Sequence, residues 1–329
     1  MGAVAPSQPG RSRESPSCPI IRAMARSLLG WLAYPLMSGG ALVFAVWALG
    51  RGWPFWSIGV AVVVVAQALA EGLEWTLPWS KGWRRSRGDF ATDVWHTLVS
   101  NRGFDLGTVA ALACFVPLGR ELSARFGWVL WPHHWPVLAQ GALALVVLDL
   151  PWYWVHRLSH AWPLLWRLHA VHHSVERMYW WNAARSHPLE TILTSGLSMA
   201  PLAFLGVSDQ ALAIVAAFSG VHSALMHSNV DLRTGPLDIF LNTARVHRWH
   251  HSPRQHESFA NFSPTVTIWD WVFGTRRFDP RATPGEDVGL GSSFEGPFPS
   301  GFLGQMRAPF EASLWRPPTV DQPKAASSS

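Results

Sequence analysis

Two long stretches without a charged residue occupy much of the first quarter of the chain. They cover residues 27–50 and 52–70, and Arg51 lies at their junction. Each stretch approaches the roughly 20 residues that an apolar helix needs to cross a bilayer. Inside a bilayer, only helices and closed barrels satisfy all of their backbone hydrogen bonds. The two stretches therefore predict a tight helical hairpin embedded in a membrane.

A second pair of apolar stretches follows the hairpin. Its first member is residues 106–119, with residues 94–100 as a possible extension of the same helix. Its second member, residues 137–148, continues into Asp149 and the first histidines. We expect both members to cross the membrane, which brings the number of predicted transmembrane helices to four.

A third pair consists of residues 191–208 and 210–226, interrupted by Gly206 and Asp209. The interruption leaves open whether this pair spans the membrane or re-enters it. Only 14% of the residues are charged, against about 25% in a typical soluble domain. Composition thus agrees with an integral, multi-pass membrane protein.

Basic residues flank the first hairpin on both sides: Arg11, Arg13, Arg22 and Arg26 before it, and Lys81, Arg84, Arg85 and Arg87 after it. Cytoplasmic loops are enriched in Lys and Arg, so both ends of the hairpin are predicted to be cytoplasmic. Each later pair returns the chain to the same side. We therefore expect both termini and all the clustered histidines on the cytoplasmic side.

Three regions are predicted along the chain. Residues 1–26 are rich in Pro, Ser and Arg and are expected to form a disordered cytoplasmic tail. Residues 27–280 form the membrane-embedded domain. Residues 281–329 form a Gly/Pro/Ser-rich tail, in which residues 302–315 make a short amphipathic segment.

Twelve of the fifteen histidines lie between His156 and His256, and eight of them form close sets. The sets are His156/His160, His169/His172/His173 and His247/His250/His251. Spacings of three and four residues place side chains on one face of a helix, and imidazole is the commonest metal ligand. Eight are too many for one zinc, which takes four ligands. Two metals held by histidines, without Cys sets nearby, point to iron and oxygen chemistry.

Two further histidines are expected to be ligands. His187 in RSHPLE and His227 in HSN each stand at the end of an apolar stretch that faces the same side. His222 lies about 140° around a helix from His227, so it is predicted to belong to the helix interior. His256 is predicted to lie on the surface or behind the ligands. The other three are expected to be buried histidines with satisfied hydrogen bonds: His96, His133 and His134.

The predicted fold class is all-α. It is a polytopic membrane helical bundle of four transmembrane helices plus a possible re-entrant pair, with a cytosolic helical cap that holds a histidine-rich di-metal site. Motifs of other enzyme classes are absent from the sequence: HExxH, the GxSxG elbow, the P-loop and GxGxxG. The net charge of +5 comes without a nucleic-acid-binding signature, so no nucleic-acid partner is expected.

The stretch from Asp149 to Ser174, DLPWYWVHRLSHAWPLLWRLHAVHHS, resembles the fatty acid hydroxylase/sterol desaturase superfamily. In that family an Asp and a Tyr-Trp precede HRxxH, and LWxxHxxHH follows. Later motifs agree in order and spacing: RSHPLE (Arg185–Glu190), HSN (His227–Asn229) and VHRWHHS (Val246–Ser252). The resemblance covers residues 141–273. One departure is Asn261-Phe262-Ser263, where the family often has Asn-Tyr-Gly.

The resemblance implies an integral membrane di-iron oxygenase that uses O2 to hydroxylate or desaturate a lipid alkyl chain. The lipid would be a fatty acyl lipid, a sterol or a related compound. It implies two iron ions (Fe2+/Fe3+), O2 as co-substrate, and no fused haem or flavin domain. Electrons would come from an external donor, cytochrome b5-like or a ferredoxin with its reductase, and the lipid would enter from the bilayer. The implied iron ligands are His156, His160, His169, His172, His173, His187, His227, His247, His250 and His251.

Histidine ligands usually donate their second ring N–H to a carboxylate or a carbonyl. Asp149 lies two helical turns before His156 and is the first candidate for this role; a salt bridge to Arg157 is the alternative. Further candidates beside the ligands are Arg185, Glu190, Asn229, Asp231 and Asn261.

The sequence is also compatible with two other functions. One is a non-redox membrane metal-binding protein or zinc transporter, although transporters usually place ionisable ligands in mid-membrane, whereas these histidine sets lie at segment ends. The other is a metal-dependent membrane hydrolase, which would act without oxygen.

Overall fold

Six long helices form the body of the protein. The computed structural model describes residues 19–291 and 297–315, and in them the regular secondary structure is helical apart from two isolated β-bridges. The long helices are α1 (Pro19–Gly50), α2 (Phe55–Thr76), α3 (Phe90–Phe126), α4 (Val137–Ala161), α6 (Pro188–Leu205) and α7 (Asp209–Met226). All six are long and apolar enough to cross a membrane. The all-α prediction is confirmed, and the third apolar pair provides two of the six helices.

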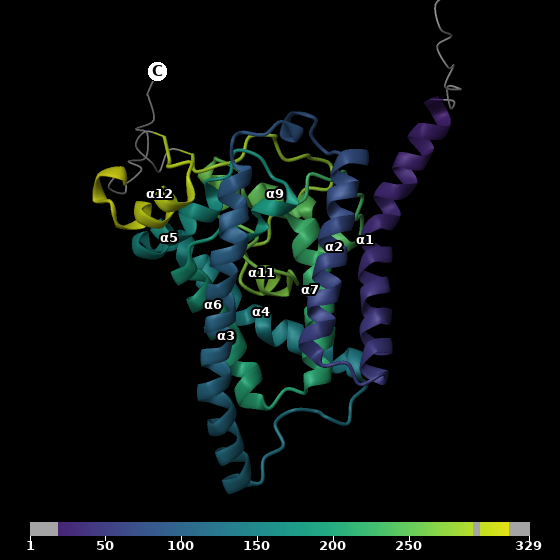
Figure 1. The fold of residues 1–329 in the computed structure, drawn as a ribbon, viewed down its shortest axis with the longest axis vertical. Helices are drawn as coiled ribbons and strands as arrows, with labels where there is room; N and C mark the ends of the chain where they lie inside the picture. The colour runs from purple at the N-terminus through teal and green to yellow at the C-terminus, as the bar shows by residue number, and fades with distance from the viewer. Residues whose placement is uncertain (1–18, 292–296, 316–329) are drawn as a thin grey trace, which may run out of the picture.

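Shorter helices gather toward one end of this body, where α5, α9 and α12 lie (Figure 1). The α-helical ones are α5 (Pro163–His173), α8 (Leu237–Phe240), α9 (Ala244–His250), α10 (Gln255–Ser258), α11 (Ile268–Val272) and α12 (Phe302–Arg307). The 3-10 turns are η1 (Gly82–Arg84), η2 (Trp180–Ala184), η3 (Ala308–Phe310) and η4 (Ala312–Leu314). This end carries the clustered histidines, because α5 and α9 contribute most of them.

Two elements extend beyond the stretches that hydropathy predicts. α3 runs from Phe90 to Phe126, because its polar residues find partners: buried Asp93 binds Arg185, and Arg102 lies 3.0 Å from Asp105. α1 begins at Pro19, so residues 19–26, which the sequence assigns to the tail, are helical. Residues 1–18 lie outside the described part of the chain.

The segment 302–315 is a helical turn followed by two 3-10 turns instead of one amphipathic helix. Pro309 lacks the backbone N–H that a continuous helix would need. The segment packs onto the bundle: Gln305 bonds His96 of α3 at 2.8 Å, and Trp315 clusters with Ala170 of α5. This part of the C-terminal region therefore contributes to the fold.

The outer faces of the long helices are apolar and exposed. Val60, Val64, Leu106 and Val109 are all more than half exposed. Soluble monomers rarely expose continuous apolar surface of this kind. The inner faces are lined by small and apolar residues, with Ile58, Ala66, Ala217 and Val221 among those buried where α1, α2 and α7 pack together.

Small residues let α3 approach α6 closely. Gly103, Gly107 and Ala111 recur every fourth residue on one face of α3 and are buried, a spacing typical of tightly packed membrane helices. A Cβ atom on Gly107 would collide with Ser195 Oγ and with the Ile192 carbonyl of α6. Because α6 begins beside the histidines, this contact also fixes one wall of the site.

Gly107→Ala is therefore expected to destabilise the protein by about 1–3 kcal/mol, the usual range for overpacking. Gly72→Ala in α2 is the matched control, since a Cβ there meets nothing within 4 Å and alanine favours a helix interior by about 1 kcal/mol. Thermal unfolding of the detergent-solubilised protein measures both. A Gly107→Ala protein as stable as Gly72→Ala would contradict the close α3–α6 contact.

Candidate metal centre

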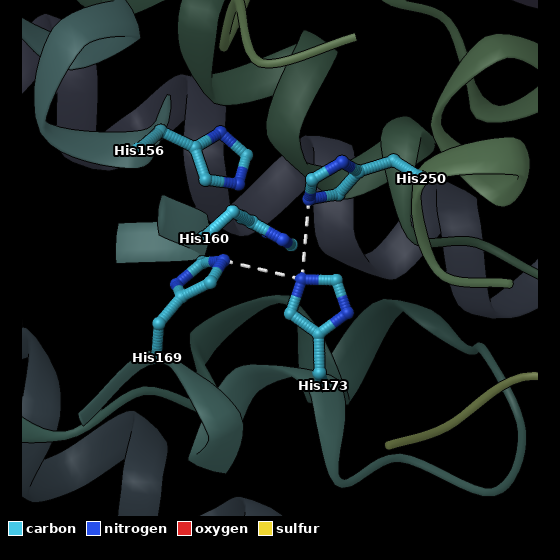
Figure 2. Close-up of side chains that lie close together, drawn as sticks. All are labelled: His156, His160, His169, His173 and His250. Atoms are coloured by element: carbon cyan, nitrogen blue, oxygen red, sulfur yellow. Dashed lines mark hydrogen bonds between the residues drawn. The ribbon is translucent and has the colours of Figure 1, made fainter. Parts of the chain in front are cut away.

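The clustered histidines converge into two groups of ring nitrogens. The first group contains His156 and His160 from α4, His169 and His173 from α5, and His250 from α9. Their five candidate ligand nitrogens all lie within 4.8 Å of one another. Figure 2 shows the five imidazole rings pointing toward one another from three helices.

The second group contains His172 from α5, His227 at the end of α7, and His247 and His251 at α9. Its four nitrogens also lie within 4.8 Å of one another. α5 and α9 contribute to both groups. In each helix the pair four residues apart stays together, His169/His173 in the first group and His247/His251 in the second, while the third histidine joins the other group. The groups adjoin each other: the rings of His173 and His251 are stacked with centroids 4.6 Å apart.

Nine of the ten predicted ligands lie in these groups, and His187 does not. His187 caps the N-terminus of α6, where its Nδ1 accepts the Leu189 N–H at 3.2 Å and its Nε2 lies 3.3 Å from the Met306 carbonyl. Both of its ring nitrogens are therefore engaged away from the groups. His187 of the RSHPLE motif is a helix cap, so the prediction that it is a metal ligand is wrong.

Backbone carbonyls hold three of the rings in a fixed tautomer. His156 Nδ1 donates to the Phe262 carbonyl at 2.7 Å, His250 Nδ1 to the Ala260 carbonyl at 2.8 Å, and His172 Nδ1 to the Arg185 carbonyl at 3.0 Å. A carbonyl only accepts, so Nδ1 carries the proton. In a neutral imidazole the other nitrogen, Nε2, then presents a lone pair, which faces the group.

Side chains hold two more rings in the same way. His169 Nδ1 contacts Glu190 Oε1 of α6, and His227 Nδ1 lies 3.2 Å from Asn182 Oδ1. The Asn182 amide is oriented by its own N–H bond to the Arg177 carbonyl at 2.6 Å. Carboxylate or amide oxygens behind a histidine are the usual outer partners of metal-binding imidazoles.

The converging Nε2 atoms fit a metal cation. In the first group, His173 Nε2 lies 3.1 Å from His169 Nε2 and 3.2 Å from His250 Nε2, and the Nε2 atoms of His156 and His160 are buried without a hydrogen-bond partner. In the second group, His247 Nε2 lies 3.0 Å from the Nε2 atoms of both His227 and His251. Lone pairs buried this close together are unfavourable unless a positive charge lies among them. An all-nitrogen donor set of this kind suits iron, zinc or copper.

Burial keeps these imidazoles neutral. It lowers the pKa of His169 to about 3 and that of His172 to about 4. For His173, His227, His247, His250 and His251, burial and then neighbouring imidazoles lower the pKa well below the ordinary value. Ligands must be deprotonated to bind a metal, so these rings are ready to coordinate at neutral pH.

Asp149 supports the site through the backbone and not through a histidine. Its Oδ2 accepts the N–H groups of Thr265 at 3.1 Å and Val266 at 2.6 Å, whereas Arg157 donates to Tyr153. Asp149 therefore contacts neither of its predicted partners, His156 or Arg157, and instead binds the backbone of a loop. The prediction of its direct contact is wrong, because α4 turns this carboxylate toward residues 265–266.

A loop at residues 260–266 connects these contacts. Asp149 holds one end, and Asp270 accepts the N–H groups of Phe262 at 2.8 Å and Ser263 at 3.0 Å. Asn261 adopts a left-handed φ of 57°, which asparagine tolerates better than most residues. This bend lies between the two carbonyls, of Ala260 and Phe262, that receive His250 and His156.

Arg185 and Asn229, both predicted to lie beside the ligands, differ in whether they contact a histidine. Arg185 contributes its carbonyl to His172, while its guanidinium binds buried Asp93 at 2.6 Å. Asn229 contacts no histidine; it exchanges hydrogen bonds with the backbone of Ser80. Asn182 and Asp270 were missed from the sequence, because neither lies in a histidine motif.

The remaining histidines lie outside both groups. His222 is buried in α7 with Nδ1 2.6 Å from the Tyr34 hydroxyl, and His96 is bonded to Gln305 and Ser100. Both are interior residues, as predicted. His256 is exposed. His133 and His134 are also exposed, in the loop between α3 and α4, so the prediction that they are buried is wrong.

Comparisons with known proteins agree with the site. Residues 141–275 match the fatty acid hydroxylase family model, a range that contains every histidine of both groups. The chain is 35% identical over 238 residues to the ornithine lipid hydroxylase of Rhizobium tropici, covering 71% of this chain and 70% of that one. It is 32% identical over 206 residues to methylsterol monooxygenase 1 of Gallus gallus, covering 60% of this chain and 62% of the relative.

Alkylglycerol monooxygenase of Homo sapiens is 33% identical over 132 residues, which cover 40% of this chain but only 29% of that enzyme. No solved structure matches. The six apolar helices together with these relatives identify a multi-pass integral membrane protein. The extent of the match to the ornithine lipid hydroxylase and the matched histidine region show that the chain belongs to the fatty acid hydroxylase family.

Proposed function

We propose that this protein is a membrane di-iron oxygenase that uses O2 and external electrons to hydroxylate or desaturate a lipid. The observation that carries the proposal is the convergence of nine histidine nitrogens into two adjoining groups. Family relatives named as lipid hydroxylases and monooxygenases support a lipid substrate. The substrates in their names, ornithine lipids, alkylglycerols and methylsterols, define the range of candidates.

The iron ligands proposed are the nine grouped residues: His156, His160, His169, His173 and His250 for one ion, and His172, His227, His247 and His251 for the other. Two irons would supply, with O2, the oxidant that an unactivated C–H bond requires. In a hydroxylation, one oxygen atom enters the C–H bond and the other leaves as water, with two electrons and two protons supplied from outside. In a desaturation, two hydrogens leave the chain and both oxygen atoms leave as water, again with two electrons and two protons supplied from outside.

The protein's own residues have separate tasks in this reaction. The carbonyls of Ala260, Phe262 and Arg185 fix the ring orientation, so that the ligand nitrogens need little rearrangement on binding. The buried position of both groups excludes bulk water, which protects reactive species from side reactions.

The site is proposed to lie on the cytoplasmic side, because basic residues flank the first hairpin at that end. Lipid would then enter from the bilayer between the helices, and electrons would arrive from a soluble or peripheral donor. A cytochrome b5-like protein or a ferredoxin with its reductase is the proposed class of donor.

Metal analysis combined with an oxidation assay tests this function. Protein purified from iron-replete cells should contain about two irons per chain. It should oxidise a lipid extract only when both O2 and a reductant are present. Isotopically labelled O2 separates the two reactions, because hydroxylation incorporates the label into the lipid and desaturation does not.

Two results would contradict the proposal. Stoichiometric zinc, with metal flux into vesicles and unchanged lipid, would indicate a transporter. Lipid cleavage that proceeds without O2 would indicate a hydrolase.

A further inference from the structure

A cavity of about 140 Å³ lies between α2 and the start of α3, apart from the histidine groups. Its walls come from the last turns of α2, from η1, from Phe90 and from the segment 177–181. These elements lie at the end of the bundle where α9 is found (Figure 1). The cavity is thus at the level of the metal centre and not at the far end of the helices.

Charged groups of both signs line this cavity. Glu71 and Glu74 contribute carboxylates from α2, and Arg84 contributes a guanidinium from η1. Arg177 also lines it, but this residue is already paired with Asp89 at 2.8 Å. Among the described residues, neither acid of α2 nor Arg84 forms an ion pair, so no ion pair competes with a ligand for these groups.

Both carboxylates are held in place by hydrogen bonds. The Glu71 oxygens accept the indole N–H groups of Trp75 at 2.7 Å and Trp180 at 2.5 Å. Glu74 Oε1 accepts the backbone N–H groups of Trp180 at 2.8 Å and Asn229 at 2.9 Å. Neutral donors orient both groups, and those around Glu71 leave its negative charge uncancelled.

Aromatic rings complete the walls. Trp75, Trp83, Phe90 and Trp181 all line the cavity, and the faces of such rings attract cations. The Arg84 guanidinium lies 4.6 Å from the centroid of the Trp75 ring, which holds this positive charge at the rim. The cavity therefore offers a negative, aromatic interior beside a positive rim.

We propose that this cavity binds the headgroup of a lipid that carries both an ammonium and an anionic group. The ammonium is held by Glu71, Glu74 and the aromatic rings, and the anionic group by Arg84. A sterol has neither charge and leaves both signs unmatched. This inference rests on the proposed function, because it names the substrate class of the same enzyme.

The cavity shares a wall with the second histidine group. Asn229, which lines the cavity, lies two residues after His227. Tyr179, another lining residue, has its backbone N–H 3.4 Å from Asn182 Oδ1, and the same oxygen lies 3.2 Å from His227 Nδ1. A headgroup bound here is separated from the proposed metal ligands by one layer of side chains.

Native mass spectrometry of the detergent-solubilised protein tests the cavity directly. The probes are dioleoyl phosphatidylethanolamine and its N-acetyl derivative, which keeps the phosphate but lacks the positive charge. The unmodified lipid is expected to bind about tenfold more tightly, as losing a charge-assisted hydrogen bond implies. Equal binding of the two lipids would overturn the proposal.

Variants assign the preference to its residues. Glu71→Gln should abolish the discrimination, whereas Glu121→Gln, at an exposed position near the other end of α3, should keep it. Arg84→Gln should weaken both lipids to a similar extent, because both retain the phosphate. A preference that survives in Glu71→Gln, or binding unchanged in Arg84→Gln, would contradict the assigned contacts. If Glu71→Gln fails to fold, the comparison of the two lipids on the wild-type protein still tests whether the ammonium is recognised. The Arg84→Gln variant, at an exposed position, still tests whether the anionic group is bound there.

Binding is measured without turnover, so the two proposals can fail separately. Selective binding by a protein that oxidises no lipid would refute the oxygenase and leave the headgroup site. Lipid oxidation without any headgroup preference would refute the headgroup site alone.

Discussion

Replacing His172 with alanine is expected to abolish lipid oxidation and to remove bound iron. His172 belongs to the second histidine group, and its Nδ1–H bond to the Arg185 carbonyl directs Nε2 at the other three rings. Alanine leaves three ligands in this group. The activity loss should exceed about 100-fold, the upper end of the effect of losing an outer hydrogen bond. Iron per chain and product formation are the two measurements.

The same substitution at His173 tests the other group. Because His173 lies among the first group's nitrogens, its loss should lower iron and activity to a similar degree through the other ion. His256→Ala is the matched control, since this exposed histidine lies outside both groups. If His172→Ala or His173→Ala retains its full iron content and activity, that histidine is not a ligand.

The apolar stretches predicted the helices well but not their ends. Hydropathy detects the part of α3 at residues 106–119, yet the helix runs from Phe90 to Phe126. The missing turns contain Asp93, whose burial is possible only because Arg185, far along the sequence, reaches it. A local pattern cannot anticipate such a partner.

Helical spacing predicted which histidines gather, but not how they divide. The i,i+3 and i,i+4 spacings predict one face for His169, His172 and His173, yet His169 and His173 join one group and His172 joins the other. Which face meets α4 and which meets the end of α7 depends on how the helices pack, and spacing does not determine this. His187 failed for a related reason, because a histidine that precedes Pro188 can cap a helix as readily as it can bind a metal.

The supporting contacts were the least predictable part of the site. Three of the five acceptors behind the rings are backbone carbonyls, which every residue possesses and no sequence pattern reveals. Asp149 was predicted to contact a histidine, whereas in the structure it holds the loop that presents the Ala260 and Phe262 carbonyls. Of the residues predicted to lie beside the ligands, only Glu190 hydrogen-bonds a grouped histidine through its side chain.

Replacing Glu190 with alanine is expected to weaken iron binding by about 10- to 100-fold, the usual consequence of losing an outer carboxylate. Glu190 Oε1 contacts His169 Nδ1 and fixes both the tautomer and the angle of that ring. Without it, the buried N–H of His169 has no acceptor, and its ring can rotate or exchange its proton onto Nε2. Iron retained during titration with a chelator measures the affinity, and turnover at saturating iron measures whether the bound ion still works.

Glu190→Gln separates the hydrogen bond from the charge. Glutamine keeps an oxygen that can accept the His169 N–H but removes the negative charge, so it should recover most of the affinity that alanine loses. Leu189→Ala, at the neighbouring, half-exposed position on α6, controls for disturbance of the helix start. Chelator resistance equal to that of the wild type in Glu190→Ala would show that the carboxylate does not support the ligand. Rescue by glutamine would instead assign its effect to the orientation of His169, because a purely electrostatic role would be lost in both variants.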